Sequence, residues 1–90
     1  MNDKDVNDVK VLVLSLLTAL AEAGSTGAPN GVLYAAVMGR YNLTTFNAAK
    51  ILLERAGFAT EAGDVTRLTD LGFKKAAEVE AMMKTTLQPS

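Results

Sequence analysis

The chain has 90 residues, of which 49% are hydrophobic and only 2 are proline, so we expect one globular domain with a modest core. Nine Lys and Arg residues nearly balance 10 Asp and Glu residues, which excludes a molecule-wide attraction to phosphate and leaves only local clusters of cations. Cysteine and histidine are absent, which excludes disulfides, zinc sites and imidazole catalysis. No motif places a base beside a nucleophile, and we therefore expect no enzymatic activity, metal or cofactor.

The first predicted helix covers residues 6–23 and ends at Gly24. One apolar stripe at helical spacing marks its core face: Val9, Leu12, Val13, Leu16, Leu20 and Ala23. Val11, Leu14 and Ala21 form a second stripe. A helix that is apolar on two sides is usually covered on two sides, so we expect a second copy of the chain to cover part of it.

The run VLVLSLLTALA within this helix has the composition of a signal-peptide core. The residues before it include Asp3, Asp5 and Asp8, whereas the start of a secretory signal is positively charged. The eleven residues of this run are also fewer than the roughly 20 that span a bilayer. We therefore interpret the run as a core helix of a cytoplasmic protein that has no contact with a membrane.

Two further helices are predicted after a plain loop over residues 24–31. The first covers VLYAAVM and ends at Gly39. The next begins at Thr44 or Thr45, either of which can cap it, and stops at Gly57. Its core face is predicted to hold Phe46, Ala49 and Leu53. Two helices with so short a connection are typical of a helix-turn-helix.

A β-hairpin and a last helix complete the predicted domain. Residues 58–62 and 65–68 are the two strands, joined through Gly63 and Asp64. Thr69 is expected to cap the last helix, which continues through Met83. The single domain of residues 1–90 then has a core of about 6–84 and a frayed tail over 85–90. The fold class is mainly α with a small β-hairpin.

This order of elements resembles the winged helix-turn-helix superfamily of small bacterial, archaeal and phage regulators, in which a three-helix core precedes a hairpin, the wing, and a C-terminal helix. The resemblance is carried by LLERAGFA before the hairpin and by LTDLG after it. Winged regulators usually place an aliphatic residue where this chain has Lys50, and we expect Ala49 and Leu52 to supply that packing. The resemblance implies binding to double-stranded DNA and regulation of transcription.

Candidate contacts to DNA follow from the predicted rotation of the third helix. Phosphate anchoring is assigned to four cations: Arg40, Lys50, Arg55 and Arg67. Base contacts are assigned to Thr45 and Asn47. Glu61 and Asp64 make the hairpin acidic, so we interpret it as an architectural element and not as one that inserts into a groove.

A homodimer is the second expectation. Its interface is predicted from the second stripe of the first helix and from the apolar face of the last helix: Val11, Leu14, Phe73, Ala76 and Met83. The alternative function is a protein-protein interaction module that does not bind DNA, with Leu14, Ala48 and Ile51 as its apolar surface.

Overall fold

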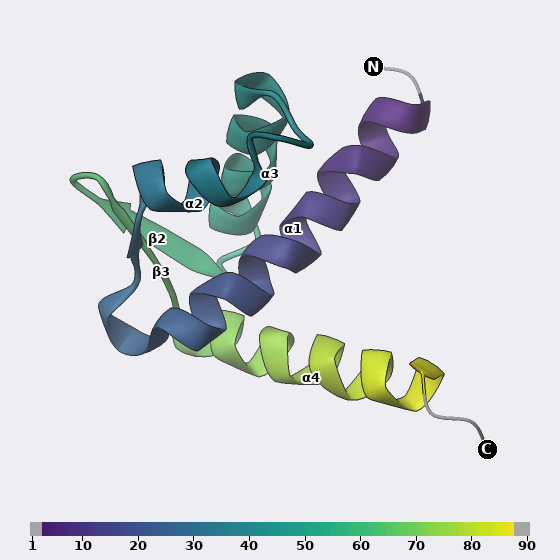
Figure 1. Ribbon diagram of the computed structural model, residues 1–90. Helices are drawn as coiled ribbons and strands as arrows, with labels where there is room; N and C mark the ends of the chain where they lie inside the picture. Colours follow the sequence, from purple (N-terminus) through teal and green to yellow (C-terminus); the bar gives the residue numbers. More distant parts are fainter. Residues whose placement is uncertain (1–2, 88–90) are drawn as a thin grey trace.

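The computed structural model describes the backbone of residues 3–87 and the side chains of Lys4 and of residues 6–84. The domain is mainly helical with a small antiparallel sheet, as predicted (Figure 1). In chain order the elements are α1 (Asp3–Ala23), a 3-10 turn (Gly24–Thr26), β1 (Ala28–Pro29), α2 (Asn30–Val37), α3 (Leu43–Arg55), β2 (Ala59–Ala62), β3 (Val65–Leu68) and α4 (Asp70–Leu87).

The core is built around α1, which crosses the domain between α3 and α4 (Figure 1). Its leucines at 12, 16, 17 and 20 are at most 1% exposed. The predicted core face of α3 is confirmed, because Phe46, Ala49 and Leu53 are all buried. Leu52 was wrongly expected to pack in place of an aliphatic residue at position 50, since its side chain is 48% exposed.

The sheet has three strands where the sequence predicted two. β3 lies in the middle, with β2 on one side and the short β1 on the other. The segment 24–31 is therefore not a plain loop. Gly27 has a φ of 74°, and a Cβ there would collide with the backbone of Thr66. The close approach of β1 to β3 thus depends on a glycine, whose role could not be inferred from composition.

Capping residues were predicted for two helices, and one of these predictions was wrong. Asn42 caps α3, since its side-chain oxygen accepts a hydrogen bond of 2.8 Å from the Thr45 amide. The cap was expected at Thr44 or Thr45 but lies earlier, at Asn42. Asparagine is at least as favourable as threonine at the N-cap position. The Thr69 cap of α4 is confirmed by a hydrogen bond from the Gly72 amide to its hydroxyl oxygen.

α4 extends to Leu87 and does not fray at Thr85. The rest of the predicted tail, residues 88–90, lies outside the described residues.

α1 also meets the length and composition of a membrane-crossing helix. The stretch Val6–Thr26 has 21 residues and is longer than the eleven-residue run considered from the sequence. A core helix of a folded domain has the same properties. Here the helix contributes Val9 and four buried leucines to the core, so within this fold it acts as the central packing element.

The junction between β3 and α4 gives a first testable prediction. A Cβ at Gly72 would collide with the carbonyl oxygen of Phe58 and approach Leu68. We expect Gly72→Ala to lower the free energy of unfolding by about 2 kcal/mol, as overpacking against a fixed backbone does. Gly31→Ala is the matched control, because Gly31 lies in α2 with open space around it and alanine favours a helix by up to about 1 kcal/mol. Urea denaturation measures both, and equal stabilities of the two variants would contradict the prediction.

Candidate nucleic-acid and protein interfaces

α2 holds α3 in place at its N-terminal half. The rings of Tyr34 and Phe46 meet edge to face with centroids 5.2 Å apart, and Leu33 of α2 is buried in the core. α3 therefore meets α2 through this ring pair and packs mainly against α1 and β2. A helix held in this way has a defined outward face.

The outward face of α3 changes character along the helix. Thr44 and Asn47 in the N-terminal half are exposed. Ile51 in the next turn is 46% exposed, and Arg55 is exposed at the C-terminal end. Arg40 is exposed in the preceding turn, 6.0 Å from the centre of the Tyr41 ring. Thr45 is only half-buried, and its amide is already used by the Asn42 cap.

Lys50 does not belong to this outward face. Its ammonium lies 3.0 Å from a carboxylate oxygen of Glu61 on β2, and its side chain is only 12% exposed. The same ammonium lies 5.8 Å from the centre of the Phe46 ring. Its charge is therefore neutralised within the domain.

Glu61 continues this contact inward as a chain of hydrogen bonds. The side-chain amide of Asn30 donates to Glu61 at 2.6 Å. The hydroxyl of Thr66, which is 1% exposed, donates to the side-chain oxygen of Asn30. The Lys50-Glu61-Asn30-Thr66 chain therefore joins α3, β2, the first residue of α2 and β3. Glu61, one of the two carboxylates that make the hairpin acidic, is therefore a structural partner of α3.

The strand register places Arg67 on the other face of the sheet. Glu61 lies opposite Thr66 in the β2–β3 ladder, and Thr60 lies opposite Arg67. Successive residues of a strand point to opposite faces, so Arg67 and Glu61 point away from each other. Because Glu61 reaches toward α3, Arg67 does not join the cations of α3. The sequence grouped Arg40, Lys50, Arg55 and Arg67 together, whereas the fold leaves Arg40 and Arg55 near α3 with their charges unpaired by any described carboxylate.

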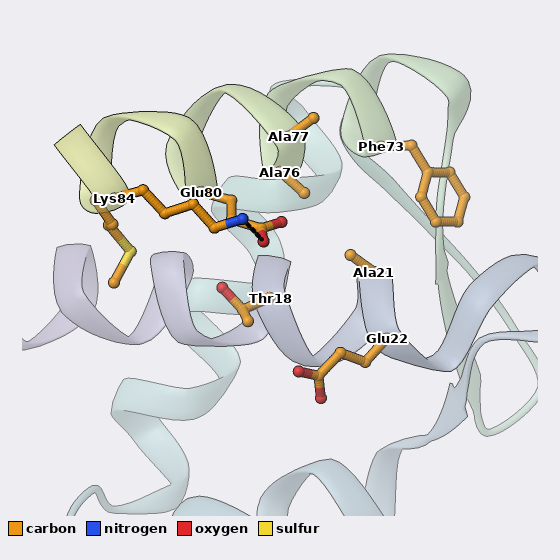
Figure 2. A pocket seen from close by; sticks show the side chains of 9 residues that line it. Thr18, Ala21, Glu22, Phe73, Ala76, Ala77, Glu80 and Lys84 are labelled. Atoms are coloured by element: carbon orange, nitrogen blue, oxygen red, sulfur yellow. Dashed lines mark ion pairs between the residues drawn. The ribbon is translucent and has the colours of Figure 1, made fainter. Parts of the chain in front are cut away.

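A groove between α1 and α4 collects part of the predicted dimer interface (Figure 2). Its volume is about 500 Å³. Small side chains form its floor, and an ion pair of 3.2 Å between Glu80 and Lys84 lies at one end. The lining residues are Thr18, Ala21, Glu22, Phe73, Ala76, Ala77, Glu80, Met83 and Lys84.

The five predicted interface residues do not share this groove equally. Phe73, Ala76 and Met83 line it, although Ala76 is 8% exposed and keeps little surface for a partner. Val11 and Leu14 are 40% and 43% exposed on α1 and do not line it. Leu14 belongs to another groove.

That second groove lies between α1 and α3, and it is lined by the three residues that the sequence assigned to the alternative protein-protein surface: Leu14, Ala48 and Ile51. Two adjoining cavities form it, of about 430 and 370 Å³, and we call them together the α1–α3 groove. Lys10 and Leu52 line both cavities. The other lining residues are Val6, Val9, Val13, Leu14, Ala48, Ile51, Leu53, Arg55, Ala56 and Phe58. Leu52, which the sequence analysis assigned to core packing, also belongs to this groove.

Among the described residues, no group of three or more Asp and Glu side chains is placed to hold a metal ion. Comparison of the chain with models of protein families, with curated proteins and with solved structures found no match.

The Lys50-Glu61 contact generates a prediction about pH. The pKa of Glu61 is lowered from its ordinary value of 4.5, chiefly by the hydrogen bond with Lys50, while partial burial opposes this and Asn30 and Glu54 lower it further. A pKa that is lower in the folded than in the unfolded chain stabilises the fold above the unfolded value. That contribution is therefore present above about pH 4.5 and is lost as the pH falls through the folded value.

We expect Glu61→Gln to flatten the dependence of thermal stability on pH between about 3 and 6, by less than about 1 kcal/mol because the pair is partly exposed. Asp64→Asn is the matched control, because it removes a carboxylate of the same hairpin that has no ion-pair partner in the described part of the chain. A Glu61→Gln variant with the wild-type pH profile would show that the contact does not form in solution.

Proposed function

We propose that this chain is a winged helix-turn-helix protein that binds double-stranded DNA in the cytoplasm, as a transcriptional regulator or accessory factor. The order α1, β1, α2, α3, β2, β3, α4 and the sheet order β1-β3-β2 support this assignment. In this reading α2 and α3 are the helix-turn-helix, α3 is the recognition helix and the β2–β3 hairpin is the wing.

The observation that carries the proposal is the pair of exposed polar side chains, Thr44 and Asn47, in the N-terminal half of α3. In helix-turn-helix proteins the first residues of the recognition helix contact base edges. Thr44 and Asn47 occupy that position and are exposed. An asparagine amide can donate to and accept from adenine in the major groove. Arg40, in the turn before α3, is the cation that we propose for the adjacent phosphate backbone.

The distribution of charge sets the expected strength of binding. Lys50 is engaged with Glu61, and Arg67 lies on the other face of the sheet. One domain then offers Arg40 and Arg55 to phosphates near α3. With so few phosphate contacts, affinity for random DNA should be weak and should depend only moderately on salt. The wing is expected to position α3 and not to enter a groove.

The test is fluorescence anisotropy of a labelled random duplex titrated at low and at moderate salt. We expect Arg40→Ala and Arg55→Ala each to weaken binding and to reduce the salt slope by about 0.9, the value for one lost phosphate contact. Lys50→Ala should change the slope less than either, because its charge already faces Glu61. Asn47→Ala should leave the slope unchanged and reduce discrimination between selected and random sequences by about 1 to 3 kcal/mol.

No binding of wild-type protein to any duplex at low salt would overturn the proposal. A larger loss of slope for Lys50→Ala than for Arg40→Ala would instead reassign the phosphate contacts.

A second copy of the chain is the proposed occupant of the groove between α1 and α4. Met83 is 51% exposed at its margin, and Phe73 and the alanines of α4 supply an apolar floor on which a helix can pack closely. Dimerisation would place two copies of α3 on neighbouring half-sites, which compensates for the small number of cations on each.

We expect Met83→Glu to convert a dimer into a monomer, because a carboxylate would be buried in the interface without a partner. Sedimentation velocity measures the mass of both proteins. Val32→Glu is the control, since Val32 is 61% exposed on α2 and lines neither groove. A wild-type mass equal to that of one chain would end the dimer proposal.

A further inference from the structure

We propose that the α1–α3 groove binds an amphipathic helix with acidic flanks, supplied by another protein. The inference does not depend on DNA binding, and it rests on the shape of the groove, its apolar lining and its charges.

The groove is long enough for a helix. Its lining extends from Val6 to Leu14 on α1 and from Ala48 to Ala56 on α3. Nine residues of a helix measure about 13 Å, which matches two to three turns of a ligand helix. The two cavities join at Lys10 and Leu52, so one continuous apolar stripe could contact both.

The apolar surface of the groove is not covered by the rest of the domain. Val6 is 39% exposed, and Leu14 is 43% exposed. On the other wall, Ile51 is 46% and Leu52 is 48% exposed. Apolar side chains gathered in a concavity fit the i, i+3, i+4 and i+7 anchors of a docked helix. A planar lipid surface would not reach the floor of a concave site.

The charges around the groove define the partner. Lys10 on α1 and Arg55 on α3 line it, and the lining contains no carboxylate. In the part of the chain that the structure describes, neither cation belongs to an ion pair. Two unpaired cations on opposite walls favour a ligand that carries carboxylates on both sides of its apolar stripe.

A second copy of this chain is a poorer fit to the groove. The last helix that it could offer, α4, carries Lys74, Lys75 and Lys84 as well as Asp70, Glu78 and Glu80. Glu78 and Glu80 already pair with Lys75 and Lys84. α4 therefore brings no excess of negative charge to Lys10 and Arg55, whereas an acidic helix does.

The probe is a synthetic 14-residue helical peptide with leucines at i, i+3, i+4 and i+7 and glutamates on both flanks. Its matched control replaces every glutamate with lysine and keeps the leucines. Both are titrated into the isotope-labelled full chain and followed by amide chemical shifts. We expect the acidic peptide to bind at least about tenfold more tightly than the basic one, with the largest shifts over residues 6–14 and 48–58.

Charge reversal separates this site from nonspecific attraction. The double variant Lys10→Glu with Arg55→Glu should lose at least about tenfold in affinity for the acidic peptide and should gain affinity for the basic one. Lys74→Glu, an exposed position on α4 outside the groove, should retain wild-type affinity. Because all three substitutions replace exposed charges, circular dichroism should show the same fold.

Three results would overturn the proposal: equal affinity for both peptides, shifts centred outside the groove, or a wild-type dimer that Leu52→Ser dissociates. The last result would assign the groove to a second copy. Loss of DNA binding in the Arg40→Ala variant has no bearing on the peptide titration, so the two proposals fail independently.

Discussion

The burial of one leucine-rich face of α1 is the constraint on which the other elements depend. Leu12, Leu16, Leu17 and Leu20 are almost completely inaccessible to solvent, and burial of each contributes roughly 1.5 to 3 kcal/mol. α3 and α4 contact this helix along different sides. Both grooves are consequences of this arrangement, because a cylinder flanked by two helices leaves a concavity on each side wherever the intervening side chains are small or partly exposed.

One ion pair within the domain links α3 to the hairpin. Lys50 and Glu61 neutralise each other between α3 and the hairpin, and Asn30 relays that contact to the buried Thr66. The negative charge of Glu61 would repel a phosphate backbone, but its ion pair with Lys50 holds the hairpin against α3. The cost is one cation fewer on α3, whose exposed outward side chains are then Thr44 and Asn47 in the N-terminal half and Ile51 and Arg55 in the C-terminal half.

The sequence predicted the elements better than their contacts. Helix periodicity and glycine stops were sufficient for α1, α3 and the hairpin, because these signals are local. Asn42 was passed over because two threonines nearby offered the same chemistry, and β1 because two residues carry no strand pattern. The Lys50-Glu61 pair could not be predicted, since it joins positions that only the packing of β2 against α3 brings together. Leu52 was misplaced because it lies about 100° around the helix from the buried Leu53 and so falls beside the core face of α3.

The hydroxyl of Thr69 donates to the Gly57 carbonyl at 2.6 Å, and the backbone amide of Thr69 donates to the Phe58 carbonyl at 2.9 Å. The direction in which α4 leaves the sheet is therefore set within its first turn, by hydrogen bonds at the far end from Met83. An 18-residue helix is about 27 Å long, so a change of about 10° at Thr69 would move its other end by about 5 Å. The distance between α1 and the C-terminal end of α4 therefore depends on the angle set at Thr69. Thr69, Gly57 and Phe58 thus influence the width of the groove between α1 and α4, although none of them lines it.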